Sequence, residues 1–125
     1  MSQSILIVDD SFTARSKLKE FLTREGFKTL DAENGHQALE LFKTGPVDLV
    51  ITDVHMPILN GVGLLTNIRS HDKNHDVPVF VLTADPEKSI QMQLRELDVK
   101  AWLVKPYEEE SLLRAIKLVL AARGQ

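Results

Sequence analysis

The chain has 125 residues, of which 43% are hydrophobic, and its 15 basic and 18 acidic side chains give a formal net charge of −3. This length is typical of one domain, so we expect a single domain over residues 1–125 whose core needs no covalent cross-links. The negative charge argues against nucleic-acid binding, zero cysteines exclude disulfides, and the absence of a secretory signal or long apolar run predicts a soluble cytoplasmic protein without membrane insertion.

Short apolar runs alternate with segments whose apolar residues recur every three or four positions, a pattern typical of strands alternating with helices. The elements expected in the first half are, in order, a strand at 4–9, a helix with Ala14, Leu18, Phe21 and Leu22 on one face, an edge strand at 27–31, and a helix with Ala38, Leu39 and Phe42 on one face. Gly26 and the Gly45-Pro46 pair are expected to end the two helices, because glycine caps a helix readily and proline cannot continue one.

The second half repeats the same alternation. Its expected elements are strands at 47–53, 77–83 and 101–104, each followed by a helix, with apolar faces formed by Leu64, Leu65 and Ile68, then Ile90, Leu94 and Leu97, then Leu112, Ile116, Val119 and Leu120. The acidic residues at 108–110 would lie in the first turn of the last helix, where they complement its dipole. Five such pairs, joined by right-handed crossovers, predict an α/β fold with a doubly wound, five-stranded parallel sheet.

Four of the apolar runs stop at polar or charged side chains. Asp9 and Asp10 follow the first strand, Asp53 the third, Thr83 the fourth and Lys105 the fifth. Each of these residues alone would more often belong to a solvated turn or strand end. If these runs are parallel central strands, however, their carboxyl ends share one edge of the sheet, where ligands bind in folds of this class. The polar stops are therefore expected to form one site.

Taken in order, these residues resemble the receiver domain of two-component response regulators, and the resemblance covers essentially the whole chain. The segment Asp53-Val54-His55-Met56-Pro57, Gly61 beyond it, and the pairs Thr83-Ala84 and Lys105-Pro106 strengthen the likeness. The resemblance implies a flavodoxin-like (βα)5 fold with strand order 2-1-3-4-5. It also implies that a histidine kinase phosphohistidine donates a phosphoryl group to Asp53, and that slow hydrolysis follows.

The residues present suit phosphoryl transfer. A carboxylate such as Asp53 can act as a nucleophile without a general base, and the reaction is catalysed mainly by positioning and charge. The three aspartates contribute −3 and Lys105 returns only +1, so a divalent cation is needed to neutralise the site, and Mg²⁺ prefers such oxygen ligands. By resemblance, Asp10, Asp53 and the backbone carbonyl of His55 bind Mg²⁺ directly, while Asp9 binds it through a water molecule.

The resemblance assigns further roles around this site. Lys105 and the Thr83 hydroxyl would hold the phosphoryl oxygens, and the Lys105–Pro106 peptide bond would be cis. His55 and Asp85 occupy positions at which members of the family tune dephosphorylation.

Thr83 and Trp102 are the expected switch residues. Trp102 stands where the family usually has a tyrosine or phenylalanine that moves inward when the threonine engages the phosphoryl group. Phosphorylation would thereby change the surface of the fourth helix, fifth strand and fifth helix for partner binding. Asp98 and Val99 replace the usual Gly-Ala pair after the fourth helix, and aspartate tolerates the left-handed conformation better than most residues.

Other functions are weaker matches to the sequence. Aspartyl-phosphate hydrolases need a second acid where His55 stands, and Asp9-Asp10-Ser11 would repel the phosphate of a flavin. A receiver-fold module that acts without phosphorylation would have lost an acid, the lysine or the threonine, and none is lost here.

We therefore expect a regulator that catalyses only its own phosphorylation and dephosphorylation and is otherwise no enzyme. Its expected partners are a histidine kinase or phosphotransfer protein and a downstream target protein. No output domain follows the last expected helix, which favours a stand-alone regulator over a receiver excised from a multidomain regulator or hybrid kinase.

Overall fold

The computed structural model describes residues 3–56, 58–84 and 88–123, so Pro57 and Asp85 lie outside the described residues. The strands are β1 (Ser4–Val8), β2 (Lys28–Ala32), β3 (Leu49–Thr52), β4 (Val79–Thr83) and β5 (Ala101–Val104). The helices are α1 (Phe12–Arg24), α2 (Gly35–Thr44), α3 (Gly61–Arg69), α4 (Lys88–Arg95) and α5 (Glu109–Arg123). β3 and β4 each begin two residues later than expected, because apolar burial starts before the ladder of paired strands does.

The strands form one parallel sheet in the order β2-β1-β3-β4-β5, as expected. The chain moves outward from β1 to β2 and then crosses back to β3, so strand order reverses between β1 and β3. Val8 lies opposite Thr52, and Thr83 lies opposite Val104, which aligns the carboxyl ends of these strands. β5 is an edge strand and is only partly buried, as the expected strand order 2-1-3-4-5 requires, so three of the four polar-stopped runs are central strands.

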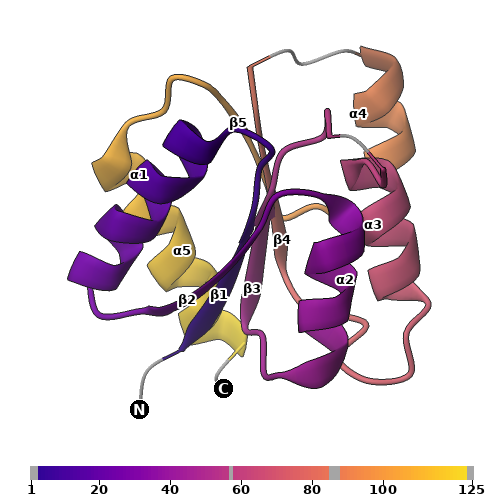
Figure 1. The fold of residues 1–125 in the computed structure, drawn as a ribbon, viewed down its shortest axis with the longest axis horizontal. Helices are drawn as coiled ribbons and strands as arrows, with labels where there is room; N and C mark the ends of the chain where they lie inside the picture. Colours follow the sequence, from indigo (N-terminus) through magenta and orange to yellow (C-terminus); the bar gives the residue numbers. More distant parts are fainter. Residues whose placement is uncertain (1–2, 57, 85–87, 124–125) are drawn as a thin grey trace.

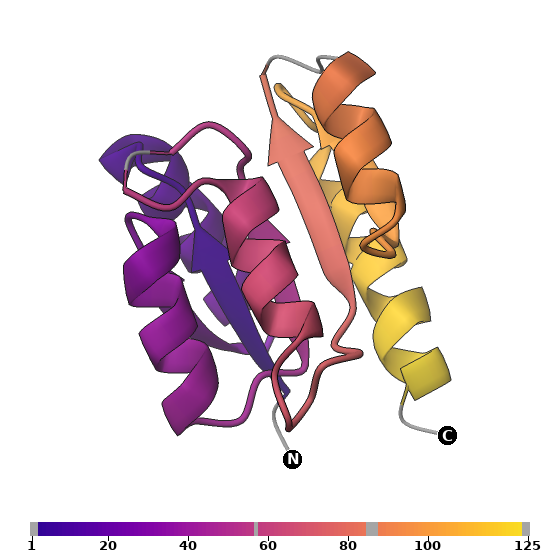
Figure 2. The same cartoon turned by 90° about the vertical axis from the view of Figure 1, so that its right-hand side faces the viewer.

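The helices cover both faces of the sheet (Figures 1 and 2). One face packs against α1 and α5, and the other packs against α2, α3 and α4. Side chains alternate between these two cores along β1, where Ile5 and Ile7 join the first core and Leu6 and Val8 join the second. Full burial of such a side chain contributes about 1.5–3 kcal/mol, so the central strands hold the site on a rigid base.

Polar side chains cap three of the helices at their first turn. Ser11, Asn34 and Asn60 each accept a hydrogen bond from the backbone N–H three residues later, at the start of α1, α2 and α3 respectively. At the other end of α1, Gly26 has a φ of 97°, in agreement with the expected left-handed cap. Asp98 likewise has a φ of 58°, so it takes the conformation expected of it after α4.

Arg69 fastens the turn after α4 to the end of α3. Its guanidinium donates to the backbone carbonyls of Leu97 and Asp98, and also to those of His75 and Val77 before β4. The bonds to Leu97 and Asp98 satisfy backbone carbonyls of the turn that follows α4, which lacks glycine. No helix among the described residues is long and apolar enough to cross a membrane.

Candidate functional site

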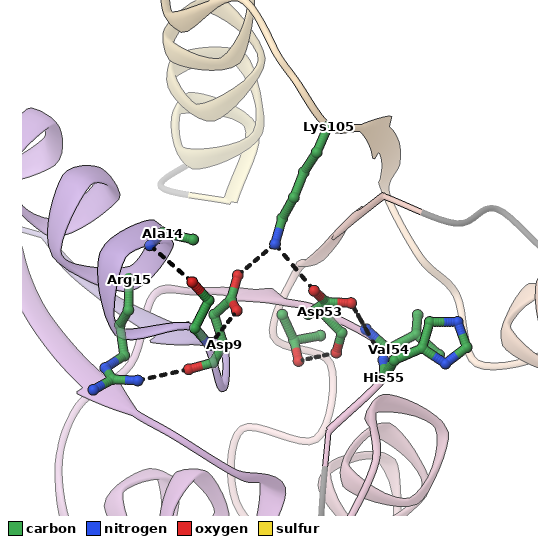
Figure 3. Close-up of polar contacts among 9 residues, drawn as sticks. Asp9, Ala14, Arg15, Asp53, Val54, His55 and Lys105 are labelled. Carbon is green, nitrogen blue, oxygen red and sulfur yellow. Dashed lines mark hydrogen bonds and ion pairs between the residues drawn. The ribbon is translucent and has the colours of Figure 1, made fainter.

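Three predicted site residues meet at the carboxyl edge of the sheet (Figure 3). The Lys105 ammonium donates to Asp9 Oδ2 at 2.6 Å and to Asp53 Oδ2 at 3.0 Å. Asp9 and Asp53 are 6% and 9% exposed, so both carboxylates are largely withdrawn from water. Two acids that directly follow β1 and β3 therefore face one cation from the loop after β5.

The Asp9 and Asp53 backbones are fixed by the sheet itself. The Asp9 N–H donates to Ala32 O of β2 at 3.1 Å, and the Asp53 N–H donates to Val8 O of β1 at 2.9 Å. The second oxygen of the Asp9 carboxylate is also held, because Asp9 Oδ1 accepts a hydrogen bond from the Ser11 N–H at 2.9 Å. Asp9 thus keeps one oxygen engaged by its own loop and presents the other to Lys105.

Asp53 is oriented by the start of the β3–α3 loop. Its Oδ1 accepts hydrogen bonds from the N–H groups of Val54 at 2.6 Å and His55 at 3.2 Å, as Figure 3 shows. Gly61 packs against this segment so closely that an added Cβ would lie 2.8 Å from Asp53 O and 2.9 Å from Val54 Cα. The loop can therefore fold back over Asp53 only because residue 61 has no side chain.

Lys105 keeps its charge in this setting. Burial alone would lower the pKa of Lys105, but its hydrogen bonds to Asp9 and Asp53 and the charges of both carboxylates hold that pKa above its ordinary value. The ammonium is therefore protonated throughout the neutral and mildly alkaline range, and the charge at the site does not depend on its titration there.

Thr83 is brought to the same edge at the end of β4. It is 1% exposed, and its backbone carbonyl accepts a hydrogen bond from the Lys105 N–H at 2.8 Å. The Lys105–Pro106 peptide bond is cis. The backbone of β4 thus fixes the start of the loop that carries the lysine.

The remaining predicted ligands, Asp10 and His55, lie next to these residues in the chain and are exposed. Within the described ranges, no three acidic or histidine side chains are already gathered around one point. The donor set nevertheless fits Mg²⁺, because the Lys105 ammonium already occupies a cation position between Asp9 and Asp53. Mg²⁺ is commonly held by only one or two carboxylates and keeps several waters.

Trp102 lies on β5 opposite Val81 and packs against the core on the α2, α3 and α4 side of the sheet. Its indole Nε1 is buried without a hydrogen-bond acceptor, the one such side-chain atom found in the described part of the chain. An unpaired buried donor costs about 1–3 kcal/mol. The indole would therefore gain from any arrangement that offers Nε1 an acceptor, which is a property that a phenylalanine at this position would lack.

Tyr107 follows the cis peptide and lines a cavity of about 290 Å³ together with Asp9, Lys105 and Glu109. Burial raises the pKa of Tyr107, and the Glu109 carboxylate raises it further.

Because Tyr107 is the one tyrosine in the chain, we expect ultraviolet titration of tyrosinate to give a midpoint above that of the denatured chain. Stability that depends on neutral Tyr107 is present below the denatured-state pKa and is lost as pH rises through the folded-state pKa. Circular dichroism over the same range checks that the chain stays folded, and equal midpoints would contradict this placement of Tyr107.

Arg15 is a further polar neighbour of the site to which the sequence pattern does not point. Its Nη1 donates to the backbone carbonyl of Asp9 at 2.8 Å. The one available signal is its position, four residues after the Ser11 cap and on the same helix face as Lys19. That signal is weak, because the acceptor of the Arg15 hydrogen bond is a backbone carbonyl, a group that every residue has and that no residue type in the sequence identifies.

Comparison with known proteins agrees with this geometry. Residues 5–117 match the family described as the response regulator receiver domain. The chain is 36% identical over 112 residues to chemotaxis protein CheY-3 of Vibrio cholerae, covering 89% of this chain and 86% of that protein. It is 32% identical over 124 residues to sporulation initiation phosphotransferase F of Bacillus subtilis, covering 99% and 98% of the two chains.

A solved structure adds a likeness of fold. The receiver domain of a Pseudomonas aeruginosa sensor histidine kinase, described with a magnesium ion coordinated in its active site cleft, superimposes with a TM-score of 0.88. The two sequences are 22% identical, and the match covers 97% of this chain and 99% of that one. The family match and the two relatives together show that the chain belongs to the response regulator receiver domain family and functions in two-component signal transduction.

Proposed function

We propose that this receiver accepts a phosphoryl group on the Asp53 carboxylate. The donor is the phosphohistidine of a histidine kinase or phosphotransfer protein: its P–N bond breaks, a P–O bond to Asp53 forms, and the imidazole leaves. The observation that carries this proposal is the Lys105 ammonium shared by Asp9 and Asp53 at 2.6 and 3.0 Å. This ion pair supports the proposal, because the carboxylate that would act as the nucleophile lies beside a cation that would bind the phosphoryl oxygens.

Each residue contributes a distinct part of the chemistry. The N–H groups that hold Asp53 Oδ1 fix the carboxylate before the donor arrives, so no reorientation is needed at the moment of transfer. The Lys105 ammonium would offset the negative charge on the phosphoryl oxygens, and the Thr83 hydroxyl would donate a hydrogen bond to one of them. Mg²⁺, held by Asp10, Asp53 and the His55 carbonyl and through water by Asp9, would neutralise the excess negative charge.

The chain would catalyse only its own phosphorylation and dephosphorylation. By the family resemblance, His55 and Asp85 occupy sequence positions at which they would influence the attack of water on the phosphorylated Asp53. A cytoplasmic location follows from the proposed donor, since a kinase that signals by phosphohistidine presents it where nucleotide is available.

The proposed output surface is formed by α4, β5 and α5. Each of these elements exposes a large apolar side chain, with Met92 67%, Val104 47% and Leu118 73% exposed. Thr83 and Trp102 belong to the paired strands β4 and β5, so a change at the phosphorylation site can reach this surface through two neighbouring strands. A downstream target protein would bind there.

Incubation with acetyl phosphate and Mg²⁺ tests the function directly. We expect intact-mass spectrometry to show the gain of one phosphoryl group, and we expect EDTA to suppress the gain because the acidic site then repels the donor. If the chain gains no phosphoryl group with Mg²⁺ present, the receiver acts as an interaction module without phosphorylation.

A further inference from the structure

Arg15 extends its side chain from α1 toward β2, behind the acidic site. Its side chain is only 12% exposed, and its guanidinium makes two hydrogen bonds in different directions. Nη1 donates to Asp9 O at 2.8 Å, and Nε donates to Asp31 Oδ2 at 3.0 Å. Figure 3 shows the first of these bonds, on the side of Asp9 away from Lys105. Arg15 therefore touches the backbone of the site without entering it.

The hydrogen bond from Arg15 to Asp9 O constrains the peptide unit between Asp9 and Asp10 as well as Asp9 itself. That oxygen belongs to the planar peptide that joins Asp9 to Asp10, so fixing it sets the direction in which the chain leaves toward Asp10. The Asp9 N–H is already held by Ala32 O at 3.1 Å. With Arg15 on the carbonyl, both peptide units that flank Asp9 are held. The exposed Asp10 side chain has no such support of its own among the described contacts.

Arg15 is itself held in place. Asp31 also accepts a hydrogen bond from Lys19 at 3.0 Å, so one β2 carboxylate holds two cations of α1. Burial acts to raise the pKa of Asp31, but the hydrogen bonds and charges of Lys19 and Arg15 outweigh it and lower that pKa. The Arg15 guanidinium also lies 5.6 Å from the centre of the Phe12 ring. Its conformation is thus fixed before any ligand binds.

We infer that Arg15 is a positioning residue for the cation and phosphoryl site, acting through the Asp9–Asp10 peptide unit. The inference rests on the proposed function, because Asp9 and Asp10 matter there as the Mg²⁺ ligands. The sign of its effect separates it from simple electrostatics. Loss of a positive charge near the acids would by itself tighten Mg²⁺ binding. Loss of a positioning residue weakens binding, because the carboxylates no longer start in the binding geometry.

The test compares Arg15→Met with Arg24→Met. Both arginines belong to α1 and lie over a phenylalanine ring, at 5.6 and 5.8 Å, but only Arg15 reaches Asp9. Mg²⁺ titrations of the folded proteins, followed by the amide shifts of residues 53–55, give the dissociation constants. We expect Arg15→Met to weaken Mg²⁺ binding about tenfold, the smaller end of the effect of groups that support metal ligands. Arg24→Met should stay within about twofold of wild type.

Arg15→Lys separates positioning from charge. Lysine keeps the charge but lacks the fork that reaches Asp9 O and Asp31 together, so it loses the positioning contacts without the gain from a removed charge, and we expect Mg²⁺ binding at least as weak as that of Arg15→Met. Unchanged or tighter Mg²⁺ binding in Arg15→Met would overturn the inference, even if the free energy of unfolding falls. A wild type that binds Mg²⁺ but gains no phosphoryl group from acetyl phosphate contradicts the proposed function alone. A wild type that binds no Mg²⁺ contradicts both.

Discussion

Asp53→Asn is expected to abolish phosphorylation while leaving the fold intact. The amide has the same shape as the carboxylate, and its oxygen can still accept the N–H groups of Val54 and His55. It is not a nucleophile toward phosphorus, however, and it removes one negative charge from the Mg²⁺ site. Loss of the Lys105 ion pair at 3.0 Å still leaves that ammonium paired with Asp9 at 2.6 Å, so no buried charge becomes unpaired.

Intact-mass spectrometry after incubation with acetyl phosphate and Mg²⁺ measures this effect. The wild type should gain one phosphoryl group, and Asp53→Asn should gain none. Asp76→Asn is the matched control, because Asp76 is an exposed aspartate whose carboxylate is 3.9 Å from Arg123, remote from the site. It should be phosphorylated like the wild type. A full mass gain in Asp53→Asn would move the acceptor to another residue and refute the assignment.

The central sheet and the main site residues could be predicted because buried strands appear as apolar runs in the sequence and site residues appear as polar or charged side chains at the ends of those runs. Leu49, Val50 and Ile51 are apolar at successive positions because β3 is covered on both faces, and all three are at most 1% exposed. Asp53 and Lys105 interrupt such patterns at the carboxyl ends of strands. The parallel topology then requires these ends to meet.

Other features depend on contacts that carry no residue-type signature. Arg15 binds a backbone carbonyl, and the unpaired state of Trp102 Nε1 depends on what surrounds it in space. The edge position of β5 follows from the strand order that the family resemblance implies and not from residue type, because Ala101–Val104 is apolar in sequence yet only partly buried. Long-range placement decides each of these features.

Lys105 has two opposing effects at the site, and these lead to opposite expectations for its removal. The ammonium competes with Mg²⁺, because it already bridges Asp9 and Asp53. It also assists transfer, because it is a cation placed where the phosphoryl oxygens would lie. Lys105→Met keeps an unbranched side chain only one atom shorter and removes the charge. We therefore expect tighter Mg²⁺ binding together with phosphorylation slowed by about 100-fold or more.

Two measurements on one preparation test this pair of effects: Mg²⁺ titration by amide shifts, and the rate of mass gain from acetyl phosphate at saturating Mg²⁺. Lys100→Met is the control, since Lys100 is exposed and pairs only with Asp98 at 3.5 Å among the described ion pairs. Lys105→Arg retains the charge in a different shape, so it should bind Mg²⁺ nearly as the wild type does and still transfer slowly. If Lys105→Met were phosphorylated at the wild-type rate, the ammonium would serve only to hold the two acids together in the absence of the metal. Slower transfer with weaker Mg²⁺ binding would instead mean that Lys105 orders the carboxylates rather than competing for them.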